Sequence, residues 1–193
     1  MFLQLKPWGQ SFLQLARDFT RRCSGIVLCE GKSDAEAIKV AAEVLGFKFR
    51  GTLAITDCGG VSGIREVAGY VAVLAHVSRK LKVISVVIDA DECSLAERAY
   101  SIISSLKARG VDVEGFSEIH EGVFKGNLPA ASLVVCVLGL MELPFRRHCL
   151  EDHFVKVLLI DGKLRESDLE RFESSKEAFK GSFPQEGCQR GQQ

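Results

Sequence analysis

The sequence has 193 residues, with 25 Lys plus Arg against 25 Asp plus Glu, so its formal net charge is zero. Its length suits one domain with extra helices at the ends, and an apolar content of 47% excludes a disordered chain. The balanced charge gives no support for binding to nucleic acid or to an anionic membrane through bulk charge, although a local basic patch is compatible with it.

Residues 1–23 are predicted to form an N-terminal helical extension, because apolar side chains from Phe12 to Phe19 recur at helical spacing. Pro7 and Gln10 interrupt the apolar stretch before them, so a signal peptide is not expected. A helix packed on the main domain is the favoured interpretation. A helix that binds a partner or a membrane surface is the alternative.

Three units of strand followed by helix come next. The predicted strands are 26–29, 53–56 and 83–88, and the predicted helices are about 33–45, 64–80 and 94–109. The pairs Ser33/Glu36 and Ser94/Glu97 have the spacing of capping boxes at helix starts. This alternation predicts an α/β fold with a mainly parallel sheet flanked by helices.

The remaining chain carries weaker signals. The expected elements are a strand at 111–113, a loop at 117–132, a buried strand at 133–138, and helices at 150–160 and 167–180. Ser167 and Glu170 would cap the last helix, and a flexible tail is expected after Gly181. The predicted division is the extension (1–23), an α/β domain (24–160, core motifs 24–115), and a C-terminal helix with its tail (161–193).

The seven cysteines include no CxxC pair, and their number is odd. We therefore expect a reduced, cytoplasmic protein without a disulfide framework. Cys149 and His153 stand four residues apart on a predicted helix and are interpreted as packing residues, and His148 beside Arg146 and Arg147 as part of a solvated face. No apolar run reaches the roughly 18 residues of a membrane span, so no membrane partner is expected.

Polar and glycine residues follow each of the three main predicted strands. Glu30 follows the first, the loop with Gly59, Gly60 and Gly63 follows the second, and Asp89 with Asp91 ends the third. Because parallel α/β units bind ligands at the carboxyl ends of their strands, we expect these residues along one edge of the sheet.

The spacing of Asp89 and Asp91 lets two carboxylates point toward one ion, and Glu30 adds a third. Oxygen donors of this kind suit Mg²⁺, with Mn²⁺ as a substitute. Crowded carboxylates also raise one another's pKa values, so Glu30 is a candidate ligand and a candidate proton donor or acceptor. Each acidic residue alone has a structural explanation as a loop or helix-start residue, whereas the combination is much rarer.

These residues carry a family resemblance. The run IVLCEGKSD (26–34), the pair Gly59-Gly60 and the run VVIDAD (86–91) together resemble the Toprim domain. Toprim domains occur in topoisomerases, bacterial primases, recombination-repair proteins and the overcoming-lysogenization-defect nucleases. The resemblance covers about residues 24–115, is closest to small stand-alone archaeal Toprim-related proteins without assigned activity, and implies a Toprim-like, Rossmann-like fold.

The resemblance also implies roles for single residues. Glu30 would be the general acid or base and a ligand, and Asp89 and Asp91 would hold Mg²⁺. Asp34 matches an acidic position of nuclease-type members and would serve a second ion, the alternative being a first-turn residue favoured by the helix dipole.

Substrate contacts follow from the same resemblance. Gly59, Gly60 and Gly63 would let the backbone approach a phosphate, tight packing being the alternative. Apart from the resemblance, Lys32 and Arg65 are candidates for substrate binding because they could form part of a basic patch. DNA or RNA is then the expected partner, with a protein partner as a further expectation. The remaining basic residues that could complete a patch are Lys80, Lys82 and Lys125.

Departures of this sequence from the family pattern narrow the range of expected functions. Cys93 stands where some Toprim enzymes have a third acid, and Tyr70 and Tyr100 lie in predicted helices of the domain itself. With no zinc-binding motif either, a topoisomerase or complete primase is disfavoured. A nuclease-like hydrolase of phosphodiesters, or a Toprim domain acting through a partner, is what we expect.

Two other interpretations stay open. The first is a non-catalytic Toprim-fold binding or regulatory module, which the neutral net charge favours because nucleases that grip phosphates usually carry basic excess. The second is a phosphatase of the haloacid dehalogenase type, which also places an Asp-x-Asp after an apolar strand. Leu158–Gly162 weakly matches the same pattern without its second aspartate.

Overall fold

The computed structural model describes residues 2–5, 22–48, 50–78 and 80–182. The strands are β1 (Phe2–Leu5), β2 (Gly25–Cys29), β3 (Leu53–Asp57), β4 (Val83–Asp89), β5 (Glu114–His120), β6 (Val123–Asn127) and β7 (Ser132–Leu138). The helices are α2 (Lys32–Val44), α3 (Val61–Val77), α4 (Leu95–Lys107), α5 (Glu151–Ile160), α6 (Glu166–Leu169) and α7 (Ser175–Gly181). The predicted α/β class is confirmed.

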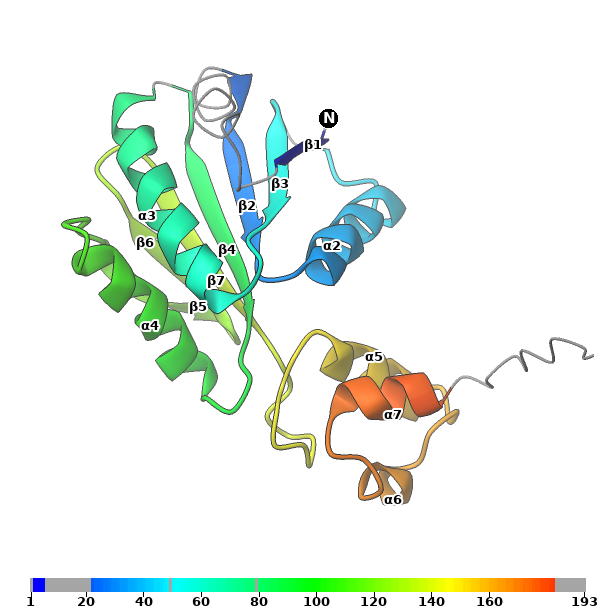
Figure 1. Cartoon of the computed structure of the whole chain (residues 1–193). Coiled ribbons are helices and arrows are strands. Elements are labelled where there is room, and N and C mark those ends of the chain that lie inside the picture. Colours follow the sequence, from blue (N-terminus) through cyan, green and yellow to red (C-terminus); the bar gives the residue numbers. More distant parts are fainter. Residues whose placement is uncertain (1, 6–21, 49, 79, 183–193) are drawn as a thin grey trace, which may run out of the picture.

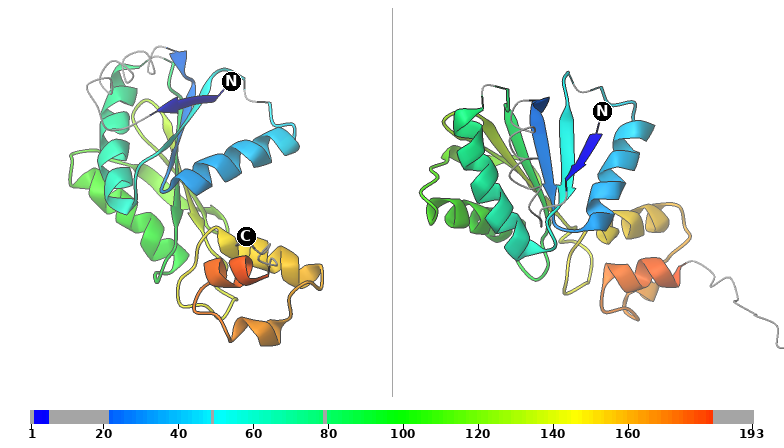
Figure 2. Two further views of the ribbon diagram at one scale, coloured as in Figure 1. Left: turned by 45° about the vertical axis from the view of Figure 1, so that its right-hand side comes forward. Right: turned by 45° about the horizontal axis from the view of Figure 1, so that its top comes forward.

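The strands form one sheet in the order β1-β3-β2-β4-β7-β6-β5. The first five strands of this order run parallel, and β6 and β5 add an antiparallel hairpin at the far edge. Helices α3 and α4 cover one face of the sheet and α2 begins on the other, as Figure 1 and Figure 2 show. The sheet is therefore mostly parallel and has helices on both faces.

The two faces follow from the alternation of side chains along buried strands. Ile26 and Leu28 of β2 belong to the larger core beneath α3 and α4, whereas Val27 and Cys29 point to the smaller core beneath α2. Both sets are buried, which is why this strand is a continuous apolar run in the sequence.

The direction of the crossovers places the candidate site. From β2 the chain passes over α2 to β3 on one side, and from β4 it leaves over α4 toward β7 on the other. Because such crossovers are right-handed, the two helices lie on opposite faces, and a crevice opens between the carboxyl ends of β2 and β4. Glu30 and Asp89 stand at those two ends.

The predicted loop over 117–132 is wrong. This stretch holds most of β5 and all of β6, and the strand expected at 111–113 begins instead at Glu114. Gly122, at a φ of 69°, makes the tight turn between the two strands. Nearly every residue of β5 is exposed, so this edge strand shows no apolar alternation in the sequence.

The N-terminal prediction is wrong for residues 2–5. Phe2–Leu5 form β1, which pairs in parallel with β3 at the sheet edge, and not part of a helix. Residues 6–21, on which the rest of the predicted helical extension falls, lie outside the described residues. The backbone hydrogen bonds of this segment are made with β3, and a search for helical periodicity does not detect such pairing.

The C-terminal helical segment (residues 139–182) packs as a unit below the carboxyl edge of the sheet (Figure 1). Its core joins side chains from the loop before α5 to all three helices: Leu143, Phe145, Val155, Leu169 and Ala178. The predicted boundary at 160/161 cuts through this core, because α5 packs with α7. The predicted tail over 183–193 lies outside the described residues.

The single helix expected over 167–180 is two short helices. The predicted cap at Ser167 is wrong, because this residue lies inside α6. Ser174 caps α7 instead and accepts a hydrogen bond from the backbone N–H of Glu177. A serine with a glutamate three residues later occurs at both places, so the sequence does not distinguish them.

Candidate functional site

Glu30 and Asp89 meet at the crevice between β2 and β4. Cys29 of β2 pairs with Val87 of β4, which sets the register of the residues that follow. The backbone N–H of Asp89 donates to Glu30 Oε2 at 3.2 Å. The Glu30 carboxylate therefore lies against the backbone of Asp89, and both residues line the same pocket.

Asp89 carries the most perturbed carboxylate of this edge. Burial, followed by the negative charges of Asp34 and Glu30, raises its pKa to about 7. The backbone N–H of Leu150 donates to Asp89 Oδ1 at 3.1 Å and partly offsets this effect. Burial also raises the pKa of Glu30, with a smaller contribution from the charge of Asp91.

Asp91 is arranged differently from Asp89. It has a φ of 54°, rare for a residue with a side chain, and its backbone forms two hydrogen bonds of 2.8 Å with His148. Both oxygens of its carboxylate are engaged, Oδ2 by Arg98 and Oδ1 by Arg147 at 3.1 Å. Two guanidinium groups therefore compensate this carboxylate, whereas Asp89 faces other acids.

Asp34 caps α2 and also lines a pocket. Its Oδ2 accepts a 2.8 Å hydrogen bond from the backbone N–H of Gly31, so the predicted Ser33/Glu36 capping box is wrong. Glu36 pairs with Lys39 at 2.8 Å instead. Asp34 is buried, and burial raises its pKa. This position agrees with both interpretations of Asp34, as a residue that caps the helix and as a ligand of a second ion.

The three glycines predicted to follow the second strand divide into two groups. Gly59 and Gly60 have φ values of 70° and 104° and line a pocket together with Asp34. Gly63 lies inside α3, where an added Cβ would stand 1.8 Å from the carbonyl oxygen of Cys58. Tight packing therefore explains Gly63, and the predicted phosphate approach remains for Gly59 and Gly60.

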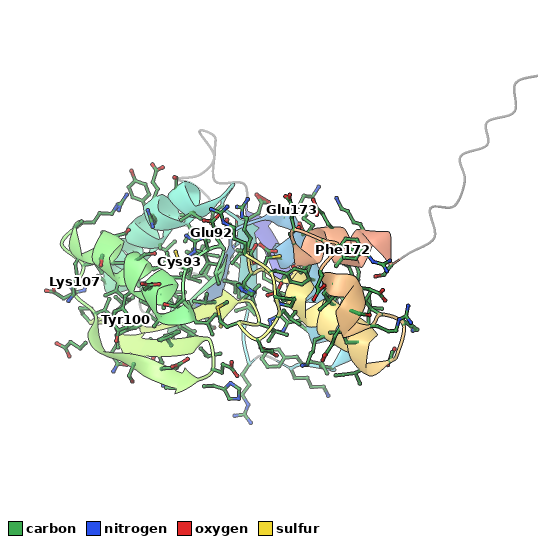
Figure 3. The ribbon with its side chains drawn as sticks, turned by 90° about the horizontal axis from the view of Figure 1, so that it is seen from below. Glu92, Cys93, Tyr100, Lys107, Phe172 and Glu173 are labelled. Atoms are coloured by element: carbon green, nitrogen blue, oxygen red, sulfur yellow. The ribbon has the colours of Figure 1, made fainter. Side chains whose placement is uncertain are left out.

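A pocket of about 770 Å³ opens between the sheet edge and the C-terminal helical segment. Glu30, Asp89 and Asp91 line its inner side. Figure 3 views the molecule from below, with Glu92 on the α/β side of this pocket and Phe172 and Glu173 on the helical segment. A smaller pocket of about 270 Å³ adjoins it, because Glu30 and Asp89 line both.

The basic side chains at the site differ from those predicted. Lys32 is exposed, and neither it nor Arg65 lines the two pockets. Arg147 and Lys176 of the helical segment line the pockets instead, and Lys176 Nζ lies 3.8 Å from Glu151 Oε1. These residues are 50 or more positions from the acidic motif in the sequence, so only the fold brings them to it.

The other predicted basic residues also lie away from the acids. Lys82 stands at the amino end of β4, where its backbone N–H donates to the Ser24 carbonyl, and Lys80 precedes it. Lys125 lies in β6 near the far edge of the sheet. The predicted patch of these three lysines around Glu30 is therefore absent.

His148 anchors the helical segment, and its assignment to a solvated face is wrong. It is buried, and its Nδ1–H donates to Asp152 Oδ2 at 2.8 Å. The same oxygen accepts a 2.8 Å hydrogen bond from the backbone N–H of Leu140. Sequence analysis missed this buried polar pair because the neighbouring residues, Arg146 and Arg147, are typical of an exposed segment.

Cys149 also faces a pocket but is not a reactive thiol. Its Sγ lies 3.2 Å from Ser175 Oγ, and burial raises its pKa to about 12. His153 is exposed, so the two do not form a ligand pair. The six described cysteines are all free: Cys23, Cys29, Cys58, Cys93, Cys136 and Cys149.

Magnesium fits the donor chemistry of this edge, since carboxylate oxygens are its preferred protein ligands. In the described ranges, however, no three His, Cys, Asp or Glu side chains are placed so that they could hold a metal ion together. The obstacle to metal binding is the carboxylate of Asp91, because it pairs with Arg98 and Arg147. A cation bound by Glu30, Asp89 and Asp91 therefore requires Asp91 to leave at least one arginine.

No helix in the described part of the chain is long and apolar enough to cross a membrane. Comparisons with curated proteins and with solved structures gave no match. The sequence profile of a family described as "Protein of unknown function (DUF3226)" matches residues 24–132, which is more than half of the chain and covers β2 to β6. The chain therefore belongs to the DUF3226 family.

Proposed function

We propose that the α/β region is a Toprim-like domain that binds Mg²⁺ and acts on nucleic-acid phosphodiesters in a nuclease-like manner. The observation that carries the proposal is the meeting of Glu30 and Asp89 at the crevice between β2 and β4. Ligand sites of parallel α/β sheets lie at this kind of crevice. Burial and, after it, the charges of Asp34 and Glu30 raise the pKa of Asp89, and a bound cation would relieve this repulsion and favour the ionised carboxylate.

The chain's own residues divide the work in this proposal. Asp89 and Asp91 hold the ion, and Glu30 donates or accepts a proton at its carboxylate, for which its raised pKa is suited. A metal ion held there would supply polarisation of a phosphoryl oxygen and stabilisation of its developing charge. Gly59 and Gly60 leave the backbone open beside the acids, and Asp34 is the candidate for a second ion.

The non-catalytic alternative has two observations in its favour. The basic residues that could have formed a patch do not line the pockets beside Glu30, and a module that does not cleave phosphodiesters needs no such patch. Asp91 is satisfied by two arginines, and a carboxylate paired in this way can be purely structural. A binding or regulatory module would keep that pairing in all states. Against it stand Arg147 and Lys176, which line the pockets and can pair with an anionic substrate. Acidic side chains outnumber the basic ones in both pockets, so a bound cation is part of this argument.

The phosphatase alternative loses its second motif. Leu158, Leu159 and Ile160 lie in α5, and Asp161 is the cap that ends this helix. A nucleophilic aspartate of that enzyme type follows a strand, so this run does not supply one. Only the sequence similarity of residues 86–91 continues to support that alternative.

Calorimetry with Mg²⁺ and Mn²⁺ on the wild type and on the double variant Asp89→Asn/Asp91→Asn tests the proposal. The substitutions keep the side-chain shape but remove two charges, so we expect metal binding in the wild type and its loss in the variant. The same samples are then assayed for cleavage of single-stranded DNA, duplex DNA and RNA. These assays separate the nuclease-like function from the non-catalytic module. Binding with cleavage supports the nuclease-like function, binding without cleavage supports the module, and no binding by the wild type overturns the metal site.

A further inference from the structure

Arg147 occupies an unusual place for a positively charged side chain. It belongs to the C-terminal helical segment, outside the residues matched by the family, yet its Nη2 donates to Asp91 Oδ1 at 3.1 Å. It also lines the larger pocket with Glu30 and Asp89. One of the two counter-ions of the second aspartate in the Asp-x-Asp pair therefore comes from outside the α/β region, and the other, Arg98, comes from α4 within it.

The backbone around Arg147 is held by hydrogen bonds, whereas its side chain is largely exposed. Next to it, His148 forms two backbone hydrogen bonds with Asp91, and Arg147 itself bridges to Ser174. Further along, the Leu150 N–H binds the Asp89 carboxylate. The side chain of Arg147 is nonetheless 63% exposed, so its guanidinium can turn without moving the chain.

Arg98, the other partner of Asp91, cannot leave in the same way. Its side chain is only 10% exposed, and its Nε–H donates to the carbonyl oxygen of Asp89 at 2.6 Å. Moving Arg98 away from Asp91 would leave a buried guanidinium without its carboxylate partner, which costs free energy. Of the two cations on Asp91, Arg147 is the one that can be displaced.

We propose that Arg147 is an exchangeable counter-ion: it neutralises Asp91 in the free protein, is displaced when a divalent cation binds, and then holds a phosphate of the substrate. The proposal rests on the proposed function and adds the residue that couples metal binding to substrate binding. A guanidinium is suited to both positions, because it pairs with carboxylates and with phosphates in the same planar geometry.

The exchange has a consequence that a purely structural ion pair lacks. Removing Arg147 takes away a competitor of the metal and a ligand of the phosphate at the same time. Metal affinity and phosphate affinity should therefore change in opposite directions. A structural pair would leave both unchanged or weaken both through loss of local order.

Arg146 provides the matched control. It is the neighbouring residue and carries the same charge at the same pocket, but it pairs with Glu92 at 3.2 Å and is 81% exposed. Substituting Arg146 changes the net charge by the same amount without touching Asp91. It separates a specific exchange from a general electrostatic effect, which depends on charge and distance alone.

The test is calorimetry on the full chain, first with Mn²⁺ alone and then with thymidine 5′-monophosphate at saturating Mn²⁺. For Arg147→Ala we expect Mn²⁺ to bind about twofold to fivefold more tightly, the range of an exposed ion pair, and the nucleotide about tenfold more weakly. Arg147→Lys should restore most of the competition but only part of the nucleotide affinity. Arg146→Ala should change either affinity by less than about twofold.

Three results would overturn the exchange. They are unchanged or weaker Mn²⁺ binding by Arg147→Ala, unchanged nucleotide binding by that variant, or the same opposite changes in Arg146→Ala. If the wild type binds Mn²⁺ and the nucleotide, these results leave the proposed function intact. If the wild type binds no Mn²⁺, the proposed function itself fails and the exchange fails with it.

Discussion

The α/β region (residues 22–138) lines the larger pocket with acidic side chains and no basic ones, whereas the C-terminal helical segment (residues 139–182) lines it with three bases and three acids. The α/β region supplies Glu30, Asp89 and Asp91 from strand ends that a large two-sided core holds in place. The helical segment, with its much smaller core, supplies Arg147 and Lys176. The difference teaches that the strand-end acids and the buried counter-ion Arg98 lie within the residues matched by the family, whereas the exposed counter-ion Arg147 comes from outside them.

The helical segment depends on few interactions, and breaking one should separate it from the α/β region. Asp152 is fully buried and accepts hydrogen bonds from His148 and from the Leu140 N–H. Asp152→Ala leaves both donors unpaired, so we expect a loss of about 2 to 4 kcal/mol, mostly as local opening of this segment. Hydrogen exchange by mass spectrometry should show faster exchange in α5 and α7 and little change in β2 and β4.

Asp161→Ala is the control for this prediction. Asp161 is an exposed aspartate at the end of the same helix and pairs only with Lys163, at 3.2 Å, among the contacts of the described residues. Its removal should cost less than about 0.5 kcal/mol. Equal protection in Asp152→Ala and in the wild type would mean that other contacts hold the segment in place.

The acids should make the α/β region sensitive to pH. The pKa of Asp89 is raised to about 7 in the folded protein, from 3.8 in the unfolded chain. The folded state therefore binds more protons between these values, and the stability present below about pH 4 is lost as the pH rises toward and through 7. Without metal, we expect the free energy of unfolding to fall by roughly 1 to 3 kcal/mol between pH 5 and pH 8.

Denaturant titrations in the presence of a chelator measure this slope. Asp89→Asn should flatten it, because the amide does not ionise and its oxygen can still accept from the Leu150 N–H. Mg²⁺ should flatten it in the wild type by favouring the ionised carboxylate. A stability that rises over the same pH range would contradict the electrostatic account.

The sequence was sufficient where local pattern and topology agree. Apolar runs predicted β2, β4 and β7, and the Ser94/Glu97 capping box is present as expected. The alternation of strands and helices also brought Glu30 and Asp89 to the same edge, because parallel units leave no other arrangement of their carboxyl ends.

The sequence was insufficient where pairing depends on distant residues. β5 has no apolar periodicity because it is an exposed edge strand, and β1 is defined by its pairing with β3. The more distant counter-ion of Asp91 followed no local rule, since Arg147 is 56 residues away along the chain. Burial of His148 was hidden because its partner Asp152 lies in a helix whose packing the sequence does not specify.

The most direct test of the account is nuclear magnetic resonance of ¹⁵N-labelled protein with substoichiometric Mn²⁺, which broadens amide signals near the bound ion. We predict that the signals of Glu30, Asp89 and Leu150 are lost first, while Gly25 and Val83 at the opposite strand ends keep theirs. The double variant Asp89→Asn/Asp91→Asn should lose this pattern. No broadening in the wild type, or weak broadening spread over all acidic surfaces, would contradict a metal site at this edge of the sheet.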